Sequence, residues 1–199
     1  MQEKLHPPEQ VAGIDEAGRG PLAGPVVAAV VILDPNKPIE GLADSKKLTP
    51  KKRAQLFAEI KAKSIAWGVG YATAVEIDEI NIHHATLLAM QRAYGVMNFE
   101  VEQVFVDGLY CPKLLSRCTA IVKGDQKVPV ISAASILAKV TRDTEMEDHH
   151  KNLPQYGFNQ HKGYPTAQHI AALKKFGPCI LHRKSYKPVR EAMILHKSY

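Results

Sequence analysis

Short apolar runs rich in valine and isoleucine recur along the first 125 residues and end at polar or charged positions. Runs of this composition and length are typical of β-strands. The segments predicted as strands are 11–14, which stops at Asp15, 26–33, 64–72, the apolar part of VEQVFVDG at 101–108, and the apolar part of CTAIVKGD at 118–125. The first two are adjacent strands joined by the turn GRGPLAG.

In the segments between and after these runs, apolar residues recur at the spacing of amphipathic helices. The stretch 45–63 predicts a helix with Thr49 as N-cap and Pro50 at the first helical position. Further helices are predicted at 75–97, 132–150 and 166–176. Because strands come first and helices mix in later, we expect an α/β domain in which helices flank a mixed central sheet.

Length and composition fit one soluble domain. A chain of 199 residues is long enough to bury a core and too short to require two domains, and no repeat or Gly/Ser linker divides it. The longest apolar run, Pro25 to Leu33, is far shorter than a membrane span. The first ten residues lack the features of a secretory signal, so the cytoplasm is the expected compartment.

The cysteine spacing bears on whether the chain has disulfides or a zinc site, and the net charge bears on the class of binding partner. Cys111, Cys118 and Cys179 form no CxxC pair and have no histidine at zinc-finger spacing, so we expect neither a disulfide framework nor a structural zinc site, only buried or idle thiols. The net charge of +6 indicates an anionic partner. Nucleic acid is favoured over a membrane surface, because no basic amphipathic helix with an aromatic face is visible.

Three of the predicted strands end in acids: Asp15 with Glu16, Asp107, and Asp125. If those strands are neighbours, four carboxylates converge at one edge of the sheet and repel one another unless cations neutralise them. Oxygen ligands select a hard divalent ion, Mg²⁺ or Mn²⁺, rather than zinc. Two such ions about 4 Å apart can activate a water and stabilise the leaving oxygen in a displacement at phosphorus.

A structural interpretation competes with each of these functional ones. Any one acid at a strand end is usually a turn former or a helix N-cap, and the dipeptides at 107–108 and 124–125 are ordinary turn sequences. The metal site therefore depends on the strands being adjacent. The glycines of Gly18-Arg19-Gly20 allow a ligand to approach the backbone closely, but a lone GxG also fits a tight turn.

Longer motifs resemble a known family, type 2 ribonuclease H (bacterial ribonuclease HII). The matching segments are GIDEAGRGPLAGPVV at 13–27, LADSKKLT at 42–49, VDG at 106–108, KGD at 123–125, SAASILAKVTRD at 132–143 and HKGYPT at 161–166. The resemblance extends to about residue 186, which implies one ribonuclease-H-like catalytic domain at 1–186, with C-terminal helices. The segment HRKSYKPV at 182–189 resembles the family's closing segment, whereas REAMILHKSY at 190–199 matches nothing. The tail, 187–199, therefore has an open role, as a short helix or a disordered end.

The resemblance implies an activity. The family cleaves the RNA strand of RNA–DNA hybrids and cuts 5′ to a single ribonucleotide embedded in DNA, leaving 3′-hydroxyl and 5′-phosphate ends. It implies a metal-dependent endonuclease that uses one or two Mg²⁺ or Mn²⁺ ions. The expected partner is a hybrid or a DNA duplex containing ribonucleotides, the expected role is removal of ribonucleotides and RNA primers, and the expected state is a monomer.

The resemblance also implies residue roles. Asp15, Glu16, Asp107 and Asp125 become the catalytic metal ligands, and Gly18, Arg19 and Gly20 become the loop that recognises the ribose 2′-hydroxyl. Tyr164 becomes the residue whose ring stacks on the following deoxyribose, where it leaves no space for a 2′-hydroxyl. Ser45 and Lys46 are expected to contact the substrate backbone. The alternatives are a half-buried aromatic for Tyr164 and a solvated helix face for the later basic residues, Lys51, Lys52 and Arg53.

Several residues and two other functions stay open at this point. Asp143 either supports the metal site or pairs with Arg142. The histidines at 149, 150, 161 and 169 are expected on helix surfaces and loops rather than in a metal cluster. A non-catalytic hybrid-binding protein is disfavoured because a binder would be expected to lose a costly acidic cluster. A nuclease acting on DNA alone is disfavoured because it has no 2′-hydroxyl to recognise.

Overall fold

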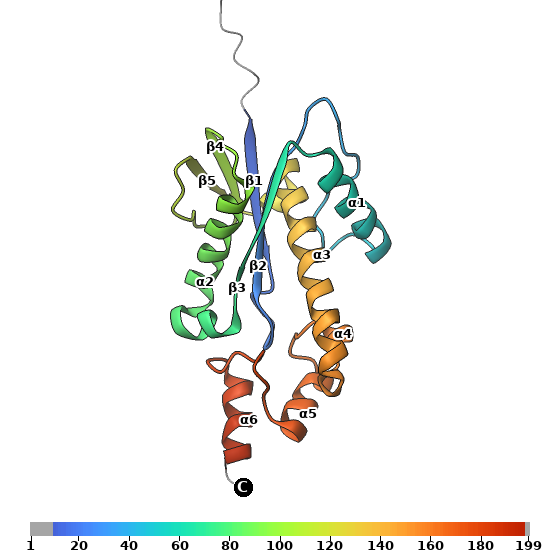
Figure 1. Cartoon of the computed structure of the whole chain (residues 1–199), viewed down its shortest axis with the longest axis vertical. Coiled ribbons are helices and arrows are strands. Elements are labelled where there is room, and N and C mark those ends of the chain that lie inside the picture. The colour runs from blue at the N-terminus through green and yellow to red at the C-terminus, as the bar shows by residue number, and fades with distance from the viewer. Residues whose placement is uncertain (1–9, 198–199) are drawn as a thin grey trace, which may run out of the picture.

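The computed structural model describes residues 10–197, and a five-stranded sheet lies at its centre (Figure 1). The strands are β1 (Val11–Ala17), β2 (Val26–Ile32), β3 (Ala66–Ala72), β4 (Gln103–Asp107) and β5 (Arg117–Ile121). Their order in the sheet is β3-β2-β1-β4-β5. β1 pairs antiparallel with β2 and parallel with β4, β2 pairs antiparallel with β3, and β4 pairs parallel with β5. The predicted α/β class with a mixed sheet is confirmed.

Different helices cover the two faces of the sheet (Figure 1). The helices are α1 (Pro50–Lys63), α2 (Ala74–Met97), α3 (Pro129–Asn152), α4 (Phe158–His161), α5 (Ala167–Phe176) and α6 (Lys187–Lys197), with short 3₁₀ turns η1 (Gly124–Gln126) and η2 (Pro154–Tyr156). Helix α2 packs on one face, and α1 and α3 pack on the other. Because β2 lies between these layers, all of its residues are buried, which explains its unbroken run of apolar residues.

The alternation of side chains along β1 sets the position of its acids. Ile14 packs into the core on the α2 side, and Asp15 points the opposite way, toward Ser135 of α3. Gly13 shares the face of Asp15, and a Cβ there would lie 2.3 Å from the carbonyl carbon of Val130. The absence of a side chain at Gly13 therefore lets α3 lie directly on β1.

Helix starts follow the predicted caps, but two strand ends differ. The hydroxyl of Thr49 accepts from the N–H of Lys52, and that of Thr166 caps α5 in the same way. β1 does not stop before the acids: it continues through Asp15 and Glu16, because its pairing with β2 runs to Ala17. Asp125 does not end a strand either; it lies in η1, after β5 has ended.

The expectation of three free thiols is wrong. Cys111 and Cys118 form a disulfide, with Cα atoms 6.0 Å apart. β5 returns beside β4 and carries Cys118 back toward the connecting loop, and a separation of seven residues gives no CxxC signal in the sequence. Cys179 is a half-buried free thiol.

The last described residues form helix α6. Val189 and Ala192 are buried against Leu22 and Leu173, so the helical alternative for the tail is confirmed as far as residue 197. The predicted absence of a secretory signal falls mainly on residues 1–9, which lie outside the described residues, as do 198–199. Within 10–197, no helix is both long enough and apolar enough to cross a bilayer.

Candidate active site

The parallel pairing of β1 with β4 brings two of the predicted acids together. Ile14 is the register partner of Val106, and the next residue on each strand is an aspartate, Asp15 and Asp107. Glu16 follows on β1 and lies half-buried. The strands are neighbours in the sheet, so the condition on which the carboxylate site depended is met.

Backbone hydrogen bonds attach Asp125 to the same place. Asp107 Oδ1 accepts from the N–H of Gly124 at 2.7 Å and from that of Asp125 at 3.4 Å. Ser132 Oγ, in the first turn of α3, donates to the carbonyl of Asp125 at 2.7 Å. The 3₁₀ turn η1 is thus held between β4 and α3, and it presents Asp125 beside Asp107.

Burial and repulsion between neighbouring carboxylates raise the pKa values of Asp15, Glu16 and Asp125. Burial raises the pKa of Asp15 well above its usual value, and the charges of Glu16 and Asp107 raise that pKa further. Burial also raises the pKa of Glu16 against the opposing charge of Arg19, with Asp107 again raising it. The pKa of Asp125 is raised by burial and then by Asp107. Proximity of like charges in a desolvated place is the physical reason for these shifts.

The donor set fits a hard divalent cation. Carboxylate oxygens are the ligands that Mg²⁺ and Mn²⁺ prefer, and a cation would relieve the repulsion that raises the pKa values of Asp15, Glu16 and Asp125. Among the described residues, no group of three or more His, Cys, Asp or Glu side chains is already arranged to hold a metal ion.

Sequence reasoning missed a fifth carboxylate at this site. Asp44 is buried, its charge raises the pKa of Asp125, and its Oδ2 accepts from Gln126 Nε2 at 3.5 Å. The N–H of Lys46 donates to the other oxygen of Asp44 at 3.0 Å. Asp44 lies inside the segment LADSKKLT, so the signal was present, but only its two following residues were selected.

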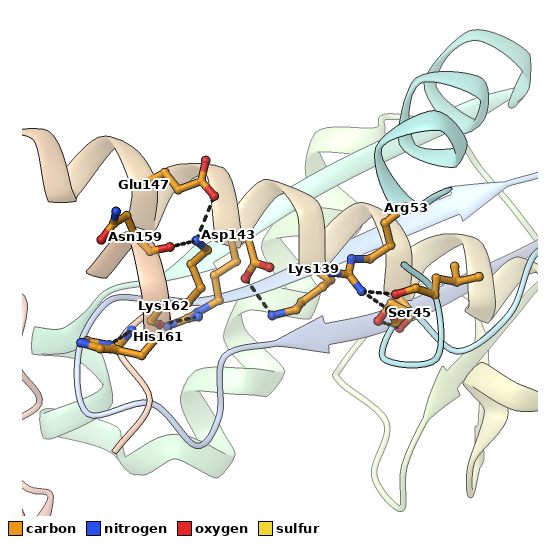
Figure 2. Close-up of polar contacts among 12 residues, drawn as sticks. Ser45, Arg53, Lys139, Asp143, Glu147, Asn159, His161 and Lys162 are labelled. Atoms are coloured by element: carbon orange, nitrogen blue, oxygen red, sulfur yellow. Dashed lines mark hydrogen bonds and ion pairs between the residues drawn. The ribbon is translucent and has the colours of Figure 1, made fainter. Parts of the chain in front are cut away.

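Ser45 and Lys46 occupy different environments. Ser45 is buried, its hydroxyl shares a 2.9 Å hydrogen bond with that of Ser135, and its carbonyl accepts from Arg53 Nη1 (Figure 2). Ser45 therefore fixes the loop to α3 rather than projecting from it. Lys46 is exposed, and its charge lowers the pKa of both Glu16 and Asp125, which places a cation at the edge of the acidic cluster.

The structure brings the GRG loop and Tyr164 together. The loop follows β1, and a Cβ on Gly20 would lie 3.6 Å from the ring of Tyr164. Gly18 has φ +95°, a conformation that L side chains rarely adopt, and a Cβ there would collide with Arg142. Tyr164 is 40% exposed, so part of this residue is accessible to a ligand.

Two buried arginines, which the sequence reasoning did not select, hold this loop. Arg183 is fully buried and donates to the carbonyl oxygens of Gly18 at 2.6 Å, Arg19 at 2.9 Å and Gly24 at 2.9 and 3.0 Å. Burial lowers the pKa of its guanidinium. These bonds add to the backbone hydrogen bonds of Leu22 and Gly24 in fixing the path of the loop.

The second arginine, Arg142 of α3, supports the same loop from the other side. It is fully buried, and burial lowers its pKa to about 10. Its guanidinium donates to the carbonyl oxygens of three residues, Pro25 at 3.0 Å, Ala23 at 3.1 Å and Lys162 at 3.0 Å. The suggested partner of Arg142, Asp143, instead binds Lys139 at 2.8 Å one turn earlier on α3 (Figure 2).

The histidines differ in part from expectation. His149 and His150 lie on α3, half-exposed. His161 and His169 are not surface residues: both are buried, with ring centroids 4.5 Å apart. They pack there because η2, α4 and α5 fold back on one another and enclose an aromatic cluster.

Comparisons with known proteins identify a family. A family model described as Ribonuclease HII matches residues 12–189. A Ribonuclease HII from Nitrosospira multiformis is 59% identical over 187 residues, 94% of each chain. The crystal structure of the ribonuclease H2 from Pyrococcus horikoshii has a TM-score of 0.80 at 30% identity and covers 96% of this chain and 100% of its own. The structure of a PCNA:RNase HII complex from Archaeoglobus fulgidus has a TM-score of 0.73 at 28% identity, covering 89% of this chain and 95% of that one.

The fold and the carboxylate-bearing edge of the sheet define a class of enzyme, the metal-dependent hydrolases of the ribonuclease H type. Within that class, this chain belongs to the Ribonuclease HII family. The resemblance noted in the sequence and the ribonuclease-H-like fold that it implied are therefore confirmed.

Proposed function

We propose that this ribonuclease H hydrolyses the RNA strand of RNA–DNA hybrids and cuts on the 5′ side of single ribonucleotides embedded in duplex DNA, leaving 3′-hydroxyl and 5′-phosphate ends. The observation that carries the proposal is the position of the acidic cluster: Asp15 and Glu16 lead directly into the glycine loop, and a Cβ added to Gly20 of that loop would lie 3.6 Å from the ring of Tyr164. The proposed metal-binding carboxylates and the proposed ribose-recognition loop are therefore adjacent in the sequence.

The four carboxylates Asp15, Glu16, Asp107 and Asp125 would hold one or two Mg²⁺ or Mn²⁺ ions. Such ions, when bound, supply charge stabilisation at the scissile phosphate and a more acidic water. Asp107 keeps its orientation through the N–H of Gly124, which leaves its second oxygen without that hydrogen bond and available to a cation. Lys46, exposed beside the cluster, would neutralise a substrate phosphate, and Ser45 would hold the loop that carries Lys46.

Gly18, Arg19 and Gly20 would recognise the ribose. The 2′-hydroxyl is both donor and acceptor, and it is the group that distinguishes RNA from DNA at one nucleotide. Recognition of a single hydroxyl requires a rigid backbone at the binding site. The hydrogen bonds from Arg183 to the carbonyls of Gly18 and Arg19 would provide that rigidity.

Tyr164 would lie against the sugar that follows the ribonucleotide, and this gives a prediction. Replacement of Tyr164 by alanine should reduce the preference for a single ribonucleotide over a continuous RNA tract by about tenfold, since loss of stacking and exclusion costs about 1–3 kcal/mol. The preference is measured as the ratio of kcat/KM on the two duplexes. Tyr164→Phe, which keeps the ring, is the matched control and should retain the ratio. An unchanged ratio in Tyr164→Ala would contradict the role.

The activity itself is tested on a labelled DNA duplex with one ribonucleotide, beside an all-DNA duplex and an RNA–DNA hybrid. We expect cleavage of the first and third that requires Mg²⁺ or Mn²⁺, with a cut 5′ to the ribonucleotide and no cut in the all-DNA control. Cleavage of all-DNA at a similar rate would instead support a DNA nuclease of the same fold. No cleavage of any duplex with either ion would contradict the proposal.

The same chemistry suggests a cellular role and setting. An enzyme that cuts beside embedded ribonucleotides begins their removal from DNA and contributes to removal of RNA primers. We propose that it acts in the cytoplasm as a monomer, which the size of one domain allows. Its net charge of +6 favours the polyanionic substrate.

A further inference from the structure

A cluster of buried imidazoles lies behind Tyr164, away from the carboxylates. His161 is 8% exposed, His169 is 0% exposed and His182 is 1% exposed. They pack against the rings of Tyr156 and Phe158. The proposed cleavage chemistry uses none of these rings. Burying a polar imidazole in a core costs free energy unless its nitrogens are hydrogen-bonded.

Hydrogen bonds determine which nitrogen of each ring in the pair His169–His182 carries the proton. The N–H of Cys179 donates to Nδ1 of His182 at 3.0 Å, so the proton of His182 is on Nε2. That Nε2 lies 3.0 Å from Nε2 of His169, and it can only donate. His169 therefore accepts on Nε2 and carries its own proton on Nδ1, which donates to the carbonyl of Tyr164 at 3.0 Å.

Both rings must be neutral for this chain of bonds to exist. A second proton on His169 would place two N–H groups face to face at its contact with His182, and a second proton on His182 would do the same at its contact with the N–H of Cys179. Burial and neighbouring imidazoles lower the pKa of His169 to about 4 and that of His182 to about 3, which agrees with neutrality. The chain of bonds from Cys179 through His182 and His169 to Tyr164 is called the imidazole relay below.

A third histidine holds the same turn from its other end. Nδ1 of His161 accepts from the N–H of Gly163 at 3.2 Å, and its Nε2 lies 2.8 Å from the carbonyl of Tyr156. The residue just before Tyr164 and the carbonyl of Tyr164 itself are thus both fixed by buried imidazoles. The exposed ring of Tyr164 projects from a backbone with little freedom to shift along Gly20.

We propose that His169 is a positioning residue that sets the place of Tyr164 over the glycine loop and thereby determines how strongly the enzyme selects deoxyribose on the 3′ side; His182 holds His169 in the tautomer that can donate to Tyr164. The inference rests on the proposed role of Tyr164. The imidazole relay acts through the backbone carbonyl of Tyr164 and touches no substrate. Its loss should therefore change selectivity more than it changes cleavage of continuous RNA.

Two substitutions at one position separate positioning from simple stability. In His169→Asn the amide nitrogen takes the place of Nδ1, so the bond to Tyr164 is kept and the bond to His182 is lost. In His169→Gln the amide takes the place of Nε2, so the bond to His182 is kept and the bond to Tyr164 is lost. Each variant removes one of the two bonds, so the damage to folding is matched.

The readout is the ratio of kcat/KM on a single-ribonucleotide duplex to that on an RNA–DNA hybrid, for wild type, Tyr164→Ala and both His169 variants. We expect His169→Gln to lose about fivefold in this ratio, the equivalent of one hydrogen bond, and His169→Asn to stay within about twofold of wild type. Equal ratios in the two His169 variants, whether both kept or both lost, would overturn the inference if Tyr164→Ala has lost the preference. If Tyr164→Ala keeps the preference, the proposed role of Tyr164 is wrong, and the inference falls with it.

A spectroscopic measurement on wild-type protein keeps the test valid if the variants fold poorly. Imidazole ¹⁵N chemical shifts distinguish the two neutral tautomers. We expect His169 protonated on Nδ1 and His182 protonated on Nε2 at neutral pH. The opposite tautomers, or a charged ring in either residue, would rule out the imidazole relay whatever the enzyme cuts.

Discussion

Asp15→Asn should abolish cleavage while making the metal-free protein more stable. Cleavage is expected to fall about a thousandfold or more, because an amide cannot supply the charge that a divalent ion needs at the scissile phosphate. Folding should persist, since asparagine can still accept the N–H of Glu16 that Asp15 Oδ1 now accepts at 2.7 Å. Retained cleavage in this variant would contradict the assignment of the acidic cluster.

The gain in stability depends on pH in a defined direction. Burial and the charges of Glu16 and Asp107 raise the pKa of Asp15, so its ionised form destabilises the fold at neutral pH. The advantage of Asp15→Asn in urea unfolding should shrink as the pH falls through that raised pKa, because the folded wild type then takes up a proton before the unfolded chain does. Asp148→Asn, which alters an exposed ion pair with Lys151, is the control and should show neither effect.

Added Mn²⁺ should reverse the order of stability. A cation that binds the folded wild type stabilises it by about 2.7 kcal/mol at a hundredfold excess over Kd. The Asp15→Asn variant lacks one of the proposed ligands and should gain much less. Urea midpoints for both proteins, with and without Mn²⁺, measure this without any nucleic acid.

Arg183→Lys should destabilise the protein by about 3 kcal/mol and also impair cleavage. The guanidinium of Arg183 spans the carbonyls of Gly18, Arg19 and Gly24, and a compact ammonium cannot reach all three. Each carbonyl left without its donor is buried or partly buried, and charged hydrogen bonds contribute about 1.5–3 kcal/mol each. The free energy of unfolding from urea titration is the measurement.

The effect of Arg183→Lys on cleavage should exceed its effect on folding. At a temperature where the variant is still fully folded, kcat/KM on the single-ribonucleotide duplex should fall, because the loop that reads the 2′-hydroxyl is no longer held. Arg190→Lys, an exposed change on α6, should alter neither quantity. A folded Arg183→Lys variant with full activity would show that the loop needs no such support.

The sequence predicted the strands and the four acids because these depend on local patterns. Valine-rich runs, the caps at Thr49 and Thr166, and acids close to strand ends are all readable within a few residues. Whether the acids meet depends on strand order, which no local pattern contains. The family resemblance supplied that information, and the pairing of β1 with β4 confirms that the strands are neighbours.

What was missed depends on contacts between distant segments. Arg142 and Arg183 look like surface residues in a basic protein, yet both are buried because the loop after β1 offers them several carbonyl oxygens. Asp44 follows no predicted strand, and its place beside Asp125 depends on a segment about 80 residues further along the chain. The disulfide of Cys111 with Cys118 needed the parallel return of β5, which spacing alone does not reveal.

During synthesis on the ribosome, β1 emerges long before β4, its parallel partner in the sheet. Strand β2 can pair with β1 at once, but β4 arrives only after residues 33–102 have emerged, and η1 and α3 follow later still. Contacts so distant in sequence form slowly, because the loop between them must first be closed. The acids therefore converge at a late step of synthesis, and a nascent chain that ends before α3 is not yet a nuclease.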